Sequence, residues 1–293
     1  MYTTTNKSTT RVGQSQATVL ARTIGPTGRY ATEIATWELV YPRYIHSELM
    51  THRMFSRNAS SSRATPVKTL IAEVESKPVY FDEVRFNQKG MTGGELVPED
   101  VEKQFHDLWM QGAVAAASIA KQMAELGIAK QTVNRILEPF LPIRTIVTAT
   151  ETDNFFRLRL AEDAQPEIRS LAKAMLQSRD SVTPVDDDVH IPYVEAFAHE
   201  PSQVRAVIRS IAACARVSVL RGDGRETSYE EDLVFVKRLL NSGHMTPFEH
   251  VAFWAGNGMH ANFCDWQSVR NCIEEGELMD AVMPELGEVL WHE

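Results

Sequence analysis

Residues 31–63 read ATEIATWELVYPRYIHSELMTHRMFSRNASSSR, and this stretch joins three kinds of local structure. Its first part, Ala31 to Tyr41, is rich in β-branched and aromatic residues with partial alternation, which predicts a strand. Pro42 suits the first turn of a helix, and apolar side chains recur along one face of residues 43–57, which predicts a helix. A hydroxyl-rich loop follows. The combination favours a mixed α/β (α+β) fold.

The sequence on both sides continues this mixture. Residues 98–127 predict a long amphipathic helix that ends at Gly127, with Leu108, Val114, Ile119 and Met123 as expected core positions. Residues 76–98, with several glycines and prolines, predict an irregular excursion. We further expect strands over 17–24 and 251–256, an extended stretch over 136–150, and helices over 130–137, 164–177, 201–215 and 229–241.

Length and composition limit the class of protein. The chain has 293 residues, 43% of them hydrophobic and 24% charged, which is typical of a folded protein. We expect a flexible tail over 1–16 and one folded domain over 17–293, in which 178–202 is a linker. The polar N-terminal residues do not resemble a secretory signal, and no apolar run approaches the ~20 residues of a membrane span.

Net charge limits the expected binding partners, and cysteine usage limits the expected cellular compartment. A formal charge of -9 argues against general binding to nucleic acid or to anionic membranes. The three cysteines lack C-x-x-C spacing, so neither a disulfide framework nor a structural zinc site is indicated. We therefore expect a protein of the reducing cytoplasm.

Local charge reverses between Arg43 and Thr69. This segment holds five basic residues and one acid, Glu48, together with four serines over 56–62. Guanidinium groups and hydroxyls are the donors that phosphate recognition requires, so the segment predicts an anion site. A basic surface loop is the alternative that composition alone leaves open.

Three blocks of sequence resemble the flavin-dependent thymidylate synthases. The first is THRMFSRNASSSR, which is similar to the family's Arg-His-Arg motif followed by Ser at the eighth position. His52, Arg53 and Ser61 match, Asn58 and Arg63 fit the flanking pattern, and Thr51 replaces the first arginine.

The second block, SGHMTPFEHVAF over 242–253, resembles the family's Gly-His-x-Ser/Thr-Pro-Phe/Leu-Glu-His segment, and ACARVSVL stands upstream of it. A hydrolytic metal site on His244, Glu249 and His250 is the competing hypothesis. The spacing matches neither H-E-x-x-H nor H-x-x-E-H, and Pro247 would break the required helix, so we expect no metal.

The third block comprises NRILEP and the segment from Thr148 to Ala172, which resembles the family's Asn-Phe-x-x-Leu-Arg and Ala-Gln-x-Glu-Ile-Arg. Arg135, Asn154 and Arg159 take the matching positions. For Glu167 and Arg169 we favour solvated positions on a helix.

The order of the blocks is unusual. In the family the second block precedes the first, whereas here it comes last. This predicts a circular permutation of a ThyX-like mixed sheet with flanking helices, in which residues 178–202 join the former ends.

The resemblance implies an activity and a distribution of roles. It implies C5 methylation of dUMP to dTMP with FAD as cofactor and with methylenetetrahydrofolate and NADPH as co-substrates, in a homotetramer whose subunits share sites. Arg159 would be the catalytic residue that contacts the pyrimidine and favours its ionised N3. The implied nucleotide-binding set is Glu48, Ser61, Arg63, Arg135 and Arg159, and the implied flavin-site set is Thr51, His52, Arg53, Asn58, Asn154, His244 and Thr246.

Departures from the family pattern leave alternatives open. Thr51 lacks the expected guanidinium, Ala59 stands where an acid is common, and Glu48 stands where glutamine is usual. A carboxylate at this position could accept a hydrogen bond from an exocyclic amine, which would favour dCMP; hydroxymethylation is a related possibility. An inactive nucleotide-binding homologue is a further alternative.

Overall fold

The computed structural model describes residues 7–26, 32–197, 199–218 and 227–276. In these residues the larger sheet has six strands, in the order β1-β2-β3-β5-β4, with β6 pairing in parallel to β2. The strands are β1 (Ser8–Val12), β2 (Ser15–Ile24), β3 (Glu33–Pro42), β4 (Ser56–Ala59), β5 (Pro142–Ala149) and β6 (Val185–Asp186). The long strands are rich in β-branched and aromatic residues, which suit a buried pleated surface.

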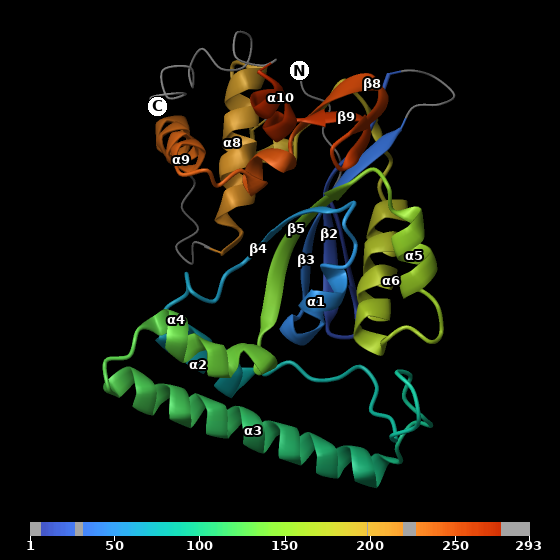
Figure 1. Cartoon of the computed structure of the whole chain (residues 1–293), viewed down its shortest axis with the longest axis vertical. Coiled ribbons are helices and arrows are strands. Elements are labelled where there is room, and N and C mark those ends of the chain that lie inside the picture. Colours follow the sequence, from blue (N-terminus) through green and yellow to red (C-terminus); the bar gives the residue numbers. More distant parts are fainter. Residues whose placement is uncertain (1–6, 27–31, 198, 219–226, 277–293) are drawn as a thin grey trace.

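One face of this sheet is covered by α6 (Pro166–Asp180), with α5 (Asp153–Arg159) beside it (Figure 1). Trp37 and Tyr41 of β3 are fully buried in the core that these elements share with Leu171 of α6. The indole of Trp37 donates a hydrogen bond to the carbonyl oxygen of Met175 at 3.3 Å, which fixes α6 on the sheet. We call this cluster the sheet core.

A helical segment lies between β4 and β5. It contains α2 (Val67–Ser76), α3 (Glu99–Glu125), α4 (Lys130–Val133) and the 3-10 helix η3 (Asn134–Phe140). Figure 1 shows α3 running across the bottom of the molecule, with α2 and α4 above it. Four buried alanines of α3 allow it to pack closely with α2 and η3: Ala113, Ala116, Ala117 and Ala120.

The C-terminal part forms a smaller sheet and its own core. The sheet has the order β7-β8-β9, made of β7 (Val189–His190), β8 (Ala252–His260) and β9 (Phe263–Ser268). The helices are α7 (Val194–Phe197), α8 (Gln203–Ala215), α9 (Tyr229–Asn241) and α10 (Val269–Glu275), with 3-10 turns η4 (Arg216–Ser218) and η5 (Thr246–Glu249). Ile211, Val236 and Phe248 are buried together in this C-terminal core.

The predicted mixed α/β class is confirmed, and most long elements fall where the sequence places them. The helices expected over 98–127, 164–177, 201–215 and 229–241 correspond to α3, α6, α8 and α9. Residues 77–98 are irregular as expected, apart from an isolated bridge between Arg85 and Leu96.

The helix expected over 43–57 is wrong beyond Leu49. Residues 43–45 form a 3-10 turn, η2 (Arg43–Ile45), and α1 (His46–Leu49) ends in a turn that leads into β4. Residues 56–59 instead pair with β5, from Ser56 opposite Thr148 to Ala59 opposite Thr145. Hydrogen bonding to β5 therefore determines the conformation of residues 56–59, although their sequence periodicity favours a helix.

The flexible tail expected over 1–16 is wrong for residues 8–16. They form β1 and the start of β2, in a hairpin closed at Gly13, whose φ of 54° suits glycine. Residues 1–6 lie outside the described residues, as do the terminal residues 277–293.

The expected linker over 178–202 is not a loop throughout. It includes the end of α6, β6, β7 and α7, and it pairs with both sheets. The stretch therefore connects the sheet core to the C-terminal core through strand pairing.

Three of the four core positions expected on α3 are wrong. The exposed fraction is 65% for Leu108, 65% for Val114 and 42% for Ile119. Met123 alone is partly buried against α2 and η3. The closely packed face consists of alanines, whereas the larger apolar side chains lie on other faces of the helix.

Candidate functional site

Arg159 lies at the C-terminal end of α5, where it contacts the turn that follows α1. Its Nε donates to Nε2 of His52 at 2.9 Å, and its Nη2 donates to the hydroxyl of Thr51 at 3.2 Å. Its Nη1 lies 3.7 Å from the carboxylate of Glu48. The first and third sequence blocks therefore meet at this guanidinium.

His52 serves as a hydrogen-bond acceptor in this cluster. Its ring is 9% exposed and makes an edge contact with Phe155, with ring centroids 4.8 Å apart. Burial, together with the nearby charges of Arg159 and Arg57, lowers the pKa of His52 to about 4. The imidazole is therefore neutral at pH 7, with its proton on Nδ1 while Nε2 accepts from Arg159.

Glu48 completes the acidic side of the cluster. Burial raises the pKa of this carboxyl group, and the adjacent Arg159 opposes that rise. Thr51 donates its hydroxyl hydrogen to the carbonyl oxygen of Glu48 at 2.7 Å, which leaves the hydroxyl oxygen to accept from Arg159. The carbonyl oxygen of Glu48 also accepts from Nη2 of Arg159, at 3.5 Å, so the residues from 48 to 52 present four acceptor groups to one guanidinium.

Ser61, Arg63 and Arg135 belong to a second cluster. The loop over 60–65 is held by Asn134, whose side-chain amide donates to the carbonyl oxygens of Ser62 and Thr65 at 2.7 and 3.0 Å. Arg135 forms an ion pair of 2.9 Å with Glu138, and the same carboxylate accepts a hydrogen bond from Ser62. The loop and η3 therefore come together as one basic, hydroxyl-bearing surface.

A cavity of about 240 Å³ opens beside this loop. It is lined by polar groups of Arg43, Ser60, Ser61, Ser62 and Arg144, with Glu73 on one wall. Burial lowers the pKa of Arg43 and raises that of Glu73. The cavity has the donors that an anion requires, although Arg63, Arg135 and Arg159 do not line it.

The second block lies against the first. The amide of Asn58 in β4 donates to the carbonyl oxygen of Cys214, within the ACARVS segment, at 2.7 Å. Contacts also join β4 to η5, which holds Thr246. His244 and Thr246 are exposed, whereas His250 is fully buried. The imidazoles expected for a metal site therefore lie in different surroundings, and no metal-binding cluster of His, Cys, Asp or Glu occurs among the described residues.

A buried polar chain links the two sheets, and sequence reasoning missed it. The imidazole of His190 hydrogen-bonds to Thr23 and Thr36, at 2.8 and 2.7 Å. Thr36 bonds to Thr148 at 2.7 Å, and Thr148 bonds to Nδ1 of His250 at 2.9 Å. We call these five residues the Thr–His chain. The threonines read as ordinary strand residues, and the apolar neighbours of His190 in VHIP were the only signal of burial.

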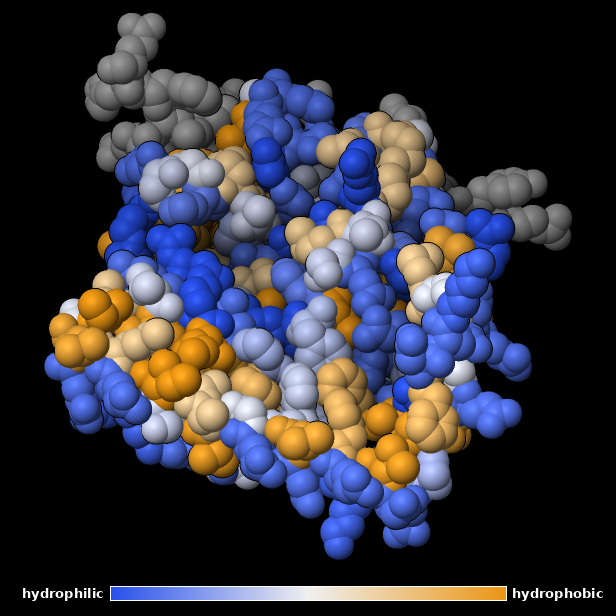
Figure 2. Space-filling model, turned by 60° about the horizontal axis from the view of Figure 1, so that its bottom comes forward, coloured by the Kyte–Doolittle hydropathy of each residue, from blue (hydrophilic) through white to orange (hydrophobic). Residues whose placement is uncertain are grey.

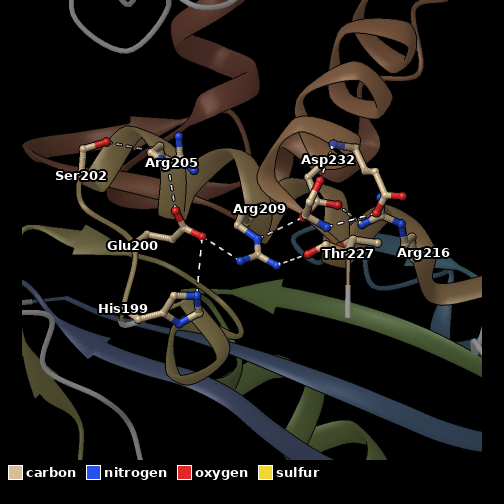
Figure 3. A network of polar contacts seen from close by, with 10 residues as sticks. His199, Glu200, Ser202, Arg205, Arg209, Arg216, Thr227 and Asp232 are labelled. Atoms are coloured by element: carbon tan, nitrogen blue, oxygen red, sulfur yellow. Dashed lines mark hydrogen bonds and ion pairs between the residues drawn. The ribbon is translucent and has the colours of Figure 1, made fainter. Parts of the chain in front are cut away.

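A charged network anchors the ACARVS segment (Figure 3). Arg216 pairs with Asp232 of α9 at 2.7 Å, and Asp232 also pairs with Arg209, which reaches Glu200. Burial alone would raise the pKa of Glu200, but hydrogen bonds from Arg205 and Arg209 hold it below its ordinary value. The segment that contacts Asn58 is thus fixed to α8 and α9.

The remaining predicted site residues stand apart from Arg159. Arg53 is exposed, and Asn154 is exposed and accepts from Arg157 at 2.9 Å.

The expectation that Glu167 and Arg169 are solvated is wrong. Glu167 is 1% exposed and accepts from the backbone N–H of Asp82, while Arg169 pairs with Glu83 at 2.5 Å.

Comparison with known proteins identifies the class. The family model for thymidylate synthase complementing protein matches residues 25–185, which is more than half of the chain. The chain belongs to this family, the flavin-dependent thymidylate synthases. The matched residues include the first and third blocks, and the second block lies outside them.

Individual relatives match parts of the chain. A flavin-dependent thymidylate synthase of Pyrococcus furiosus is 31% identical over 97 residues, which cover 31% of this chain and 40% of that protein. The chain thus matches about two-fifths of the length of this curated relative.

Two solved structures show partial likeness. The UMP/dUMP methylase PolB of Streptomyces cacaoi, bound with 5-Br dUMP, has a TM-score of 0.40 at 18% identity, over 51% of this chain and 67% of that chain. Thymidylate synthase X of Helicobacter pylori, with FAD and dUMP, has a TM-score of 0.36 at 18% identity, over 50% and 67%.

Proposed function

We propose that this chain methylates C5 of a pyrimidine deoxynucleoside monophosphate, with dUMP as substrate and dTMP as product. Arg159 carries the proposal. Its side chain is 22% exposed, and its Nε and Nη2 are oriented by His52 and Thr51. Its Nη1 keeps N–H groups for a ligand, because Glu48 approaches it only to ion-pair distance.

The residues present fit the cofactor that the family uses. Arg53 and Arg63 are exposed, and neither side chain forms an ion pair with a carboxylate among the described residues. Free guanidinium groups of this kind suit the pyrophosphate of FAD and the phosphate of a nucleotide. When bound, reduced FAD supplies the hydride, methylenetetrahydrofolate the carbon unit, and NADPH the electrons that reduce the flavin.

The residues of the chain would divide the remaining work. Ser61, Arg63 and Arg135 would hold the nucleotide, with Ser61 and Arg135 directed at the phosphate. Arg159 would donate to the pyrimidine and stabilise negative charge on the ring as N3 ionises, which raises electron density at C5. Thr51, His52, Arg53, Asn58, Asn154, His244 and Thr246 form the proposed flavin side.

The proposed reaction needs no thiolate nucleophile from this chain. Cys214 and Cys272 are buried and Cys264 is partly buried, and none of the three takes part in a disulfide among the described residues. Burial raises the pKa of the Cys214 thiol, which disfavours the reactive thiolate. Cysteines without disulfides suit the reducing cytoplasm, where we place the protein. No helix among the described residues is both long and apolar enough to cross a bilayer.

We also propose that the order of the blocks reflects a circular permutation within one catalytic domain, with 178–202 as the joining segment. The contact between Asn58 and Cys214 and the bond between Thr148 and His250 support it, because each joins blocks far apart in the chain.

We propose a homotetramer whose subunits share sites. Arg159 and the cavity beside Ser61 form separate clusters within one chain, which supports this assembly.

A cytosine nucleotide is the second candidate substrate, and Glu48 favours it. Its carboxylate lies beside Arg159, where it could accept from the exocyclic amine that cytosine has and uracil lacks. Product could then be the methylated or the hydroxymethylated base.

Reconstitution with FAD tests the assignment. We expect purified protein to show a flavin absorption band after reconstitution and to bind dUMP by calorimetry. Arg159→Ala should retain the flavin band and lose nucleotide binding by at least about tenfold, in keeping with loss of a charged hydrogen bond. Lys173→Ala, an exposed change on α6, serves as the matched control. Protein that takes up no FAD would refute the proposal, and dUMP binding without turnover would identify an inactive homologue.

A further inference from the structure

Helix α3 carries a second apolar stripe that the chain does not cover. Its buried face, formed by four alanines, packs on α2 and η3. The second stripe contains Leu108, Ala115, Ile119 and Leu126. The exposed fraction is 65% for Leu108, 42% for Ile119 and 79% for Leu126, and Ala115 is also exposed. Figure 2, with the bottom of the molecule turned forward, shows hydrophobic side chains distributed along this face.

The spacing of the stripe is that of a coiled-coil seam. Its positions are separated by seven, four and seven residues, with Gly112 and Gln122 at the intervening positions of the repeat. The uncovered stripe begins at Leu108, because Phe105, one turn earlier, packs against Tyr80 and Phe81 of the same chain. Such a 3.5-residue repeat places the side chains on one line along a helix, suited to a second helix. Gln104, Gln111 and Ser118 border the stripe on the side away from the buried alanines, with no charge that would repel an apolar partner.

We propose that α3 pairs through this stripe with α3 of a second copy of the chain, in antiparallel orientation. The stripe is self-complementary, because its midpoint lies between Ala115 and Ile119. Rotation by 180° about that point sets Leu108 against Leu126 of the copy and Ala115 against Ile119 of the copy. A two-fold interface requires this property, and it is unusual for an arbitrary apolar face.

Charge decides the orientation. The first turn of α3 contains three carboxylates, Glu99, Asp100 and Glu102, whereas the last turn contains one, Glu125, and is followed by Lys130 and Arg135. Parallel pairing would set the acidic turns of two copies together. Antiparallel pairing separates them by most of the helix length, about 40 Å, and brings each toward the basic end of the other copy.

The same charges argue against a membrane as the occupant. Over its length α3 has five carboxylates and two lysines. Helices that bind anionic lipid surfaces present lysine and arginine on the polar face. The inference extends the proposed assembly, but it stands on α3 alone and does not use turnover as a readout.

Analytical ultracentrifugation of the full chain tests the interface. Wild-type protein at about 20 µM should sediment as an oligomer. Leu108→Glu and Ile119→Glu should each raise the dissociation constant of the α3 pair by at least about 100-fold, since each change buries two charges per interface. Val114→Glu is the matched control, because Val114 is exposed to 65% like Leu108 but lies off the stripe. Circular dichroism checks that each variant is folded.

A monomeric wild type, or variants of Leu108 and Ile119 with unchanged mass, would overturn the proposal. Equal dissociation by Val114→Glu would also overturn it, because the effect would then not belong to the stripe. If the Leu108 and Ile119 variants sediment as a smaller species but still bind FAD, the interface is supported independently of the reaction.

Cysteine cross-linking tests the orientation. The double variant Ala115→Cys/Ile119→Cys should form an intersubunit disulfide on mild oxidation, whereas Leu108→Cys alone should not. In antiparallel pairing the two copies of residue 108 are separated by 18 residues along the axis, about 27 Å. Cross-linking of Leu108→Cys and not of the double variant would show parallel pairing and refute the proposed orientation. Wild type, with its own three cysteines, is the background control.

Discussion

Arg159 owes its orientation to a single turn of chain. Glu48, Thr51 and His52 all precede β4, and each directs an oxygen or nitrogen acceptor toward the guanidinium. A guanidinium presents its donors in a fixed fork, so two of these bonds are enough to set the plane of the group. Thr51 thus has a structural use where the family has arginine, since its hydroxyl holds Arg159 without adding a second positive charge.

His52 offers a test of this arrangement at the residue scale. His52→Ala removes the acceptor of the 2.9 Å bond, and we expect about a tenfold loss of dUMP affinity as Arg159 loses its orientation. His52→Gln can still accept through its amide oxygen and should recover most of the loss. Calorimetric titration with dUMP and, separately, with FAD distinguishes the two roles. Weakened FAD binding with unchanged dUMP binding would show that His52 serves the flavin instead.

Glu48 is the residue through which substrate choice is tested. Glu48→Gln supplies both a donor and an acceptor, so we expect preference to move from dCMP toward dUMP by about tenfold or more. The measurement is the ratio of kcat/KM for the two nucleotides. An unchanged ratio would mean that Glu48 does not read the base.

At the scale of elements, the Thr–His chain joins β2, β3 and β5 to β7 and the end of η5. All five members are at most 4% exposed, so they are shielded from water. Hydrogen bonds in such surroundings strengthen one another, and an unpaired member is costly. The chain therefore fixes how the second motif block lies on the larger sheet.

Thr148 tests the chain at the larger sheet, because its hydroxyl bonds to both Thr36 and His250 and its loss leaves both without this partner. Thr148→Val conserves shape and removes the hydroxyl, so we expect a loss of about 2–4 kcal/mol in the free energy of unfolding. Thr148→Ser keeps the hydroxyl and should lose less. Urea unfolding at pH 7 measures both, and equal losses would show that the hydroxyl does not matter.

The sequence predicts elements better than it predicts their surroundings. Regular patterns over 98–127, 164–177, 201–215 and 229–241 place four helices correctly, since each is long and strongly periodic. Residues 43–57 fail because pairing with β5 decides their conformation. The candidate site shows the same difference. The motifs predict roles for Arg159 and His52, but the hydrogen bond between them depends on tertiary packing.

Periodicity also misassigns which face of α3 is buried. Leu108 and Ile119 are larger than the alanines, so hydrophobicity ranks them as core, whereas close helix packing favours small side chains. His190 is missed for the opposite reason, because it follows three aspartates that resemble a solvated loop. Burial of a polar residue depends on partners that are distant in the chain.

At the scale of the whole molecule, two buried histidines connect the sheet core to the C-terminal core. Burial lowers the pKa of His190 and of His250 to about 3, from an ordinary value near 6.5. Between these pH values the unfolded chain binds protons that the native protein does not. Stability from these neutral histidines is therefore fully present above about pH 6.5 and is lost as pH falls toward 3.

Unfolding across pH measures this effect. The free energy of unfolding should fall between pH 6.5 and 4.5 by as much as about 1.4 kcal/mol per pH unit for each histidine. In the variant His250→Gln, the part of the pH dependence that His190 and His250 cause should fall by about half. This holds even if the variant has a lower free energy of unfolding at pH 7. A pH slope that is the same in both proteins would contradict the account.

The central claim is that Arg159, held by Glu48, Thr51 and His52, activates a pyrimidine nucleotide for flavin-dependent transfer of a one-carbon unit. Mass spectrometry of nucleotide products tests it most directly, with dUMP and dCMP incubated in parallel with FAD-loaded protein, isotopically labelled methylenetetrahydrofolate and NADPH. The account predicts that one nucleotide gains the labelled carbon with wild type and with Lys173→Ala, but not with Arg159→Ala. Labelled product formed at the wild-type rate by Arg159→Ala, or no labelled product from either nucleotide with flavin-loaded wild type, would contradict it.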